Sequence, residues 1–91
     1  MELSVLILTH NRPKLFERCL KSVLDQIHNN VEVIVNNDSC DITEIAHPQV
    51  QYYYEQFSDL SANYEFLLNK ATGQYVYYLE DDDYLNEQFF E

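Results

Sequence analysis

Four short apolar runs, separated by segments with helical periodicity, constrain the fold of this chain more than any other feature. The runs cover residues 3–8, 31–35, 50–54 and 75–79, and the first two are almost entirely aliphatic. Runs of this length without regular polar alternation are typical of strands that are buried on both faces of a parallel sheet. We therefore expect strands at these positions, joined by helices.

Two of the connecting segments carry apolar residues at helical spacing. The first begins at Pro13, which suits the first turn of a helix, and its apolar stripe consists of Leu15, Phe16, Cys19, Leu20, Val23, Leu24 and Ile27. The second is expected to start at a cap formed by Ser58 or Ser61, and its stripe consists of Leu60, Tyr64, Leu67, Leu68 and Ala71. Gly73 stands where a left-handed residue would close this helix. The stripes place the Cys19 thiol and the Tyr64 ring in the core.

A third, shorter helix is expected between the second and third apolar runs. Asp41, followed by Glu44, resembles a capping box, in which the first residue caps the helix and the second reaches back to it. His47 and Pro48 would end this helix.

The alternation of strands and helices predicts the arrangement of the sheet. It implies right-handed crossovers and a Rossmann-like, three-layer α/β/α fold with a mostly parallel sheet. We expect the strand at residues 3–8 to lie between those at 31–35 and 75–79. The length of 91 residues suits one small domain, so residues 1–91 are treated as a single domain. Ligands of such sheets bind beyond the carboxyl ends of the strands, which is where the site is expected.

The charge of the chain restricts its partners. Five basic and 16 acidic residues give a formal net charge of -11, which disfavours nucleic acid or an anionic membrane as a direct partner. With a single glycine, the chain has neither a dinucleotide-binding glycine motif nor a Walker motif, so a phosphate-bearing ligand would need a cation. The apolar run at the N-terminus is too short for a signal or a membrane span, and we expect a cytoplasmic location.

Polar residues follow three of the expected strands, at residues 9–12, 36–39 and 80–83. The last of these tails is Glu80, Asp81, Asp82 and Asp83. Four consecutive carboxylates repel one another, and solvent, a raised pKa or a divalent cation with oxygen ligands would relieve this. A solvated acidic turn is the alternative, but the position at the ligand-binding edge favours a Mg²⁺ or Mn²⁺ site that would hold a diphosphate.

Four stretches together resemble the family-two glycosyltransferases, which have the GT-A-type nucleotide-diphospho-sugar transferase fold. Residues 5–13 look like the opening strand and loop of that family, and residues 18–26 resemble its Arg-Cys-Leu-x-Ser-x-x-x-Gln signature. Residues 32–39 are similar to its second strand and Asn-Asn-Asp-Ser turn, and residues 70–83 to the strand that delivers its DxD-type motif. The stretches follow in the order and at the spacing of the family, over nearly the whole chain.

The resemblance implies a role for each matching residue. Thr9 and Asp38 would hold the base, uracil, of a UDP-sugar, with Asn11 and Arg12 shaping the same wall. Glu80 stands where the family contacts ribose, although the commoner residue there is Asp, whose side chain is one methylene shorter. Asp82 would bind Mn²⁺ or Mg²⁺, with Asp81 and Asp83 as supporting acids, Asp81 on the nucleotide-sugar side and Asp83 on the metal side.

The resemblance also shows what the chain lacks. In the family the catalytic base lies after the DxD-type motif, where this chain has only residues 84–91. We therefore expect the N-terminal, donor-binding half of a truncated GT-A domain, which binds donor and metal without efficient transfer. Leu85, Phe89 and Phe90 are expected to begin an amphipathic helix that mediates self-association into a homo-oligomer.

Two other readings remain open at this point. The first is a non-catalytic interaction module that has kept the fold. The second is a receiver-type, Mg²⁺-dependent phosphoacceptor domain, which would need an aspartate after the third strand and a lysine after a fifth. The third run instead ends at Glu55 and Gln56, and there is no fifth run, which disfavours the receiver reading.

Overall fold

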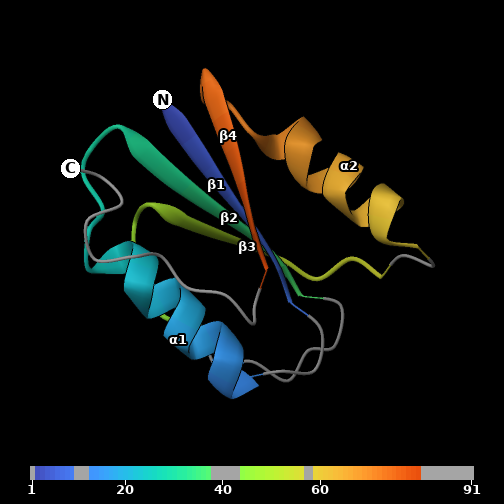
Figure 1. The fold of residues 1–91 in the computed structure, drawn as a ribbon, viewed down its shortest axis with the longest axis horizontal. Helices are drawn as coiled ribbons and strands as arrows, with labels where there is room; N and C mark the ends of the chain where they lie inside the picture. Colours follow the sequence, from blue (N-terminus) through green and yellow to red (C-terminus); the bar gives the residue numbers. More distant parts are fainter. Residues whose placement is uncertain (1, 10–12, 38–43, 57–58, 81–91) are drawn as a thin grey trace.

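The computed structural model describes residues 2–9, 13–37, 44–56 and 59–80. Its elements are, in chain order, β1 (Leu3–Thr9), α1 (Pro13–Leu24), β2 (Val31–Asn37), β3 (Val50–Tyr53), α2 (Leu60–Lys70) and β4 (Tyr75–Glu80) (Figure 1). The four strands and the two longer helices predicted from the sequence are confirmed. Residues 85–90, on which the self-association prediction depends, lie outside the described part of the chain.

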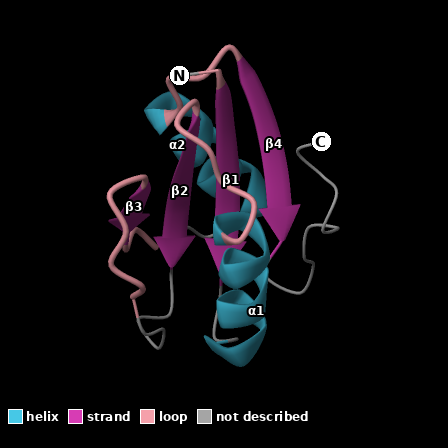
Figure 2. Cartoon of the chain, turned by 90° about the vertical axis from the view of Figure 1, so that its left-hand side faces the viewer, coloured by secondary structure: helices cyan, strands magenta, loops and turns pink. Residues whose placement is uncertain are grey.

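The four strands form one parallel sheet in the order β3-β2-β1-β4. Figure 2 shows the strands side by side and pointing the same way. Leu3 of β1 pairs with Val31 of β2 on one side and with Tyr75 of β4 on the other. The prediction that the first strand lies between the second and the fourth is therefore confirmed.

The helices cover opposite faces of the sheet, so the three-layer α/β/α architecture is also confirmed (Figure 1). Alternate residues of each strand point to opposite faces. On β1, Val5 and Ile7 pack in the core cluster that contains Phe16 of α1, whereas Leu6 packs with Leu67 of α2. The same alternation on β2 completes both cores.

The two cores are unequal in size. α1 buries four side chains, Phe16, Cys19, Leu20 and Val23, whereas Leu67 is the only apolar side chain that α2 buries among those described. Burying one large apolar side chain is worth about 1.5–3 kcal/mol. The α1 face therefore supplies most of the apolar stabilisation, and α2 depends more on polar contacts.

The α2 helix begins at a different cap from the one expected. Its N-cap is Asp59, whose Oδ1 accepts a hydrogen bond of 2.7 Å from the amide of Ala62. The positive end of the helix dipole also stabilises a carboxylate at this position. The prediction of Ser61 as the cap is wrong, and Ser58 lies outside the described residues.

The short helix expected after Asp41 is absent from its described part, residues 44–47. In that segment the Tyr52 hydroxyl accepts a hydrogen bond from the amide of Ile45 and donates one to its carbonyl oxygen, both at 2.9 Å. A side chain from β3 thus satisfies both backbone groups of Ile45, which a helix would otherwise pair within itself. The capping-box prediction is wrong for these residues.

A buried carboxylate ties the segment after α2 to the amino-terminal end of the sheet. Oε2 of Glu32 accepts hydrogen bonds from Ser4 Oγ at 2.5 Å, from Thr72 N at 2.7 Å and from Thr72 Oγ1 at 2.8 Å. Burial by itself raises the pKa of Glu32, but the hydrogen bonds from Ser4 and Thr72 outweigh it, so this pKa lies below the ordinary value.

Gly73 is required by close packing rather than by a left-handed conformation. Its amide donates a hydrogen bond of 2.8 Å to Ser4 Oγ, and a Cβ at this position would lie 2.7 Å from the backbone nitrogen of Ser4. The helix itself ends at Lys70, and its C-cap is Ala71, whose backbone is extended and whose amide donates to the carbonyl oxygen of Leu68. The prediction of Gly73 as a left-handed cap is therefore wrong.

We predict that Glu32→Gln lowers the free energy of unfolding by about 1–3 kcal/mol at neutral pH, because the acceptor of three hydrogen bonds loses its charge. The pKa of Glu32 is lower in the folded than in the unfolded chain. Its stabilising contribution is therefore present above about pH 4.3, the ordinary pKa of glutamate, and is lost as the pH falls through the folded-state value.

Urea unfolding of wild type and Glu32→Gln at neutral pH and at about pH 3.5 measures this effect, since pH 3.5 lies below the ordinary pKa. The stability difference between the two proteins should shrink in acid. The exposed Glu65→Gln is the matched control and should change stability little at either pH. A difference that stayed constant with pH would contradict the assignment.

We further predict that Gly73→Ala destabilises the fold by about 1–3 kcal/mol, because the added methyl group must displace the backbone of β1. Gln74→Ala, at the exposed neighbouring position, should change stability by less than about 0.5 kcal/mol. Thermal unfolding followed by circular dichroism compares the two variants. Equal stability of Gly73→Ala and wild type would show that the contact with Ser4 is not tight in solution.

Candidate functional site

Three adjacent strands end at one edge of the sheet. Thr9 at the end of β1 pairs with Asn37 of β2, and Leu8 pairs with Glu80, the last residue of β4. The ladder thus extends beyond the apolar runs into the polar residues that follow them. Thr9 and Asn37 are fully buried, whereas Glu80 is exposed.

Of the predicted site residues, the structure describes Thr9 and Glu80, and it brings them to the same edge. The others lie outside the described residues, and their roles stay predictions: Asn11, Arg12, Asp38, Asp81, Asp82 and Asp83. The prediction that Thr9, Asp38 and Asp82 share one edge of the sheet is therefore tested for Thr9 alone.

Glu80 contacts both helices. Its carbonyl oxygen accepts a hydrogen bond from the Cys19 thiol of α1, with the sulfur at 3.6 Å. Its Oε1 lies 3.5 Å from the Tyr64 hydroxyl of α2. Cys19 is fully buried, as predicted, whereas Tyr64 is half-buried and packs beside the Leu6 cluster instead of lying wholly within the core.

A buried amide cluster holds the end of β2, and the sequence analysis missed it. Asn36 donates from Nδ2 to Asn63 Oδ1 at 2.7 Å and to the carbonyl oxygen of Glu55 at 3.0 Å, and its Oδ1 accepts from the Glu55 amide at 3.0 Å. Asn36 and Asn63 are both buried. Asn36 lies on the same buried face of β2 as Glu32 and Ile34, and an amide at such a position is the signal that could have revealed the cluster, since buried amides need partners.

The donor set is suited to a hard cation. Within the described ranges there is no group of three or more His, Cys, Asp or Glu side chains that could hold a metal ion. The exposed carboxylate of Glu80 stands at the strand end and is followed in the sequence by Asp81, Asp82 and Asp83. Carboxylate oxygens are the ligands that Mg²⁺ and Mn²⁺ prefer, so the chemistry of these residues fits either ion.

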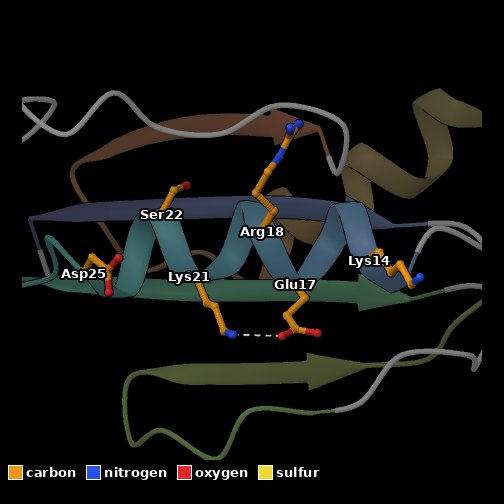
Figure 3. Close-up of a pocket in the computed structure, with 6 residues that line it drawn as sticks. All are labelled: Lys14, Glu17, Arg18, Lys21, Ser22 and Asp25. Carbon is orange, nitrogen blue, oxygen red and sulfur yellow. Dashed lines mark ion pairs between the residues drawn. The ribbon is translucent and has the colours of Figure 1, made fainter.

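A shallow depression of about 560 Å³ lies along the outer side of α1 (Figure 3). Its lining includes Lys21 and Glu17, which form an ion pair of 2.8 Å with both side chains more than half exposed. An exposed pair one helical turn apart contributes little to stability. Its lining residues lie on the side of α1 that faces away from the sheet, and this surface is not part of the candidate site. None of the described helices is long and apolar enough to cross a membrane.

We predict that Asn36→Ala lowers the free energy of unfolding by about 2–3 kcal/mol, because it removes three hydrogen bonds and leaves buried polar groups without their partner. Asn69→Ala, an exposed position on α2, makes the same chemical change and should be nearly neutral. Urea unfolding of both variants provides the measurement. If the two changes cost the same, the amide cluster would not stabilise the fold.

Comparison with known proteins agrees with this geometry. The model of "Glycosyl transferase family 2" matches residues 4–91. Glycosyltransferase GlyA of Streptococcus pneumoniae is 25% identical, over 99% of this chain and 14% of its own length. A Campylobacter jejuni GalNAc(5)-diNAcBac-PP-undecaprenol beta-1,3-glucosyltransferase is 32% identical, over 92% of this chain and 30% of its own length.

Among solved structures, that of S. aureus TarS 1-349 superimposes with a TM-score of 0.80 at 22% identity, over 97% of this chain and 29% of the TarS 1-349 chain. The chain thus spans less than a third of each of these three proteins. The superposition shows the GT-A fold. Since the family model covers nearly every residue and the sheet places the matching strand ends together, the chain belongs to glycosyl transferase family 2.

Proposed function

We propose that this chain binds a nucleotide sugar, a UDP-sugar, at the carboxyl edge of β1, β2 and β4, as the donor for glycosyl transfer to an acceptor. The observation that carries the proposal is the register of the sheet. Thr9 pairs with Asn37, and Leu8 with Glu80, so the residues assigned to the base, the ribose and the cation follow strands that end side by side.

In this proposal each strand end has its own part of the donor. Thr9, with Asn11, Arg12 and Asp38, holds the uracil base, and Glu80 with Asp81 contacts the ribose side. The burial of Thr9 and Asn37 supports a rigid base-binding wall, because buried polar groups keep a fixed orientation. The exposure of Glu80 supports a carboxylate that remains available to ligand.

Complexes of a protein with the same fold support UDP as the nucleotide of the donor. TarS, which shares the fold, has been solved in complex with UDP and in complex with UDP-GlcNAc. The C. jejuni relative is named as a glucosyltransferase. The chain spans less than a third of each of these proteins, and the part that it shares with them is the part to which we assign donor binding.

A divalent cation completes the proposal on electrostatic grounds. The chain has a formal net charge of -11, and a diphosphate near Glu80 and the three aspartates that follow it would meet like charge. Asp82, with Asp83, would hold Mn²⁺ or Mg²⁺. Such an ion acts as a Lewis acid that offsets the charge of the nucleoside diphosphate.

We predict that isothermal titration detects UDP binding with Mn²⁺ and at least about tenfold weaker binding with chelator, which corresponds to about 1.4 kcal/mol. Asp82→Asn should lose the metal-dependent part, because it removes a charge with little change in shape. Asp38→Asn should weaken UDP relative to other nucleoside diphosphates, because it removes an acceptor for a base N–H.

Asp25→Asn is the matched control, since Figure 3 shows this exposed residue at the end of α1 that lies away from the carboxyl ends of the strands. It should bind UDP as wild type does. Equal binding with and without chelator, or wild-type affinity of Asp82→Asn, would refute the metal site and leave the acidic run as a solvated turn. Absence of UDP binding under every condition would favour the non-catalytic interaction module.

A further inference from the structure

Glu80 is held from both faces of the sheet by residues that have no assigned role in donor binding. From the α1 face, the Cys19 thiol donates to its carbonyl oxygen, with the sulfur at 3.6 Å. From the α2 face, the Tyr64 hydroxyl lies 3.5 Å from its Oε1. The first contact fixes the backbone at the end of β4, and the second limits where the carboxylate can go.

On the α1 face, the polar residues of the Arg-Cys-Leu-x-Ser-x-x-x-Gln stretch behave differently from one another. Ser22 Oγ donates to the carbonyl oxygen of Cys19 at 2.6 Å, and Gln26 Nε2 donates to that of Ser22 at 3.2 Å. Both of these bonds join residues within the stretch 19–26. Cys19 instead donates across to β4 from a fully buried position. Cys19 therefore couples the helix to the end of β4.

On the α2 face, Tyr64 is itself oriented by β4. Its ring packs edge-to-face on Tyr78, with ring centroids 4.9 Å apart and an interplanar angle of 86°. Tyr78 precedes Glu80 on the same face of the strand. The hydroxyl is thus carried by a ring that rests on the strand whose last side chain it contacts.

The contact with Tyr64 addresses a physical problem created by glutamate at position 80. A glutamate side chain has one more rotatable bond than aspartate, so fixing it in one position costs more conformational entropy. A hydroxyl that already restricts Oε1 lowers the part of this cost that falls on ligand binding. The backbone contact from Cys19 likewise fixes the point at which the acidic run begins.

We propose that Cys19 and Tyr64 are positioning residues that hold Glu80 from the two faces of the sheet and so set its contact with the donor. This inference rests on the proposed function. Tyr64 and Glu80 form a matched pair, in which the Tyr64 hydroxyl restricts the longer glutamate side chain so that it can contact the donor. Neither side chain needs to touch the donor.

The matched pair is tested with a double-mutant cycle of Tyr64→Phe and Glu80→Asp, measuring the UDP affinity with Mn²⁺ by isothermal titration. In the wild-type background, Tyr64→Phe should weaken binding about threefold to tenfold, a range set by one hydrogen bond to a partly solvated carboxylate. Combined with Glu80→Asp, the same change should cost less than about twofold, because the shorter acid no longer reaches the hydroxyl. Equal losses in both backgrounds, or no loss in either, would overturn the pairing.

The role of Cys19 is tested with Cys19→Ala, Cys19→Ser and a control, Val23→Ala. Val23 is buried on the same helix, and its truncation leaves a cavity without touching Glu80. Cys19→Ala should weaken metal-dependent UDP binding about threefold or more, and Cys19→Ser should restore part of it because a hydroxyl is a donor. Val23→Ala should lower the melting temperature and leave affinity unchanged at a temperature where it is folded. Affinity losses that simply follow stability across the three variants would overturn the proposal, and Cys19→Ser keeps the test open if Cys19→Ala does not fold.

The titrations distinguish a wrong proposed function from a wrong positioning role. If wild type does not bind UDP with Mn²⁺, the proposed function is wrong and the positioning role falls with it. If wild type binds and needs Asp82, but Tyr64→Phe and Cys19→Ala bind with wild-type affinity, the proposed function stands and only the positioning role is wrong.

Discussion

The parallel pairing of β1 with both of its neighbours is the constraint on which the rest of the structure depends. Leu3 is opposite both Val31 and Tyr75, so β1, β2 and β4 start at the same level. Since the strands are of similar length, they also end at the same level, and the residues after them must share an edge. The common edge is thus a consequence of the aliphatic runs and their register, and it needs no contact among the polar residues themselves.

The two helices are attached to this sheet by different interactions. α1 is held by four buried side chains, which is enough for the apolar face to fix its position. α2 buries less, and polar contacts anchor it and the segment after it at both ends: Asn63 meets Asn36 at the carboxyl edge, and Thr72 meets Glu32 at the amino edge. Hydrogen bonds depend on direction more than apolar contacts do. These two contacts therefore fix the rotation of α2 about its own axis and its position along the strands.

The sequence was sufficient for the parts of the fold that depend on periodicity and insufficient for those that depend on a partner far along the chain. The strand order and the opposite faces of α1 and α2 follow from apolar patterns, which are local. The roles of Glu32, Asn36 and Gly73 depend on residues 19 to 69 positions away. The expected helix after Asp41 failed for the same reason, because Tyr52 lies beyond the segment whose backbone it satisfies. At the candidate site, the edge shared by Thr9 and Glu80 could be predicted, whereas the contacts of Cys19 and Tyr64 with Glu80 could not.

The described part of the site separates rigid neutral groups from exposed charge. Thr9, Asn36 and Asn37 are fully buried at the ends of β1 and β2, and Glu80 at the end of β4 is exposed. Neutral amides and hydroxyls can be buried when the protein supplies hydrogen bonds, whereas a cluster of carboxylates can be buried only with a cation or at a large cost in free energy. A ligand that is neutral and planar at one end and anionic at the other matches this separation, provided that a cation accompanies its anionic end. A nucleoside diphosphate has that form, which is why the separation of burial and charge along one sheet edge supports a nucleotide donor and argues against a ligand that is uncharged throughout.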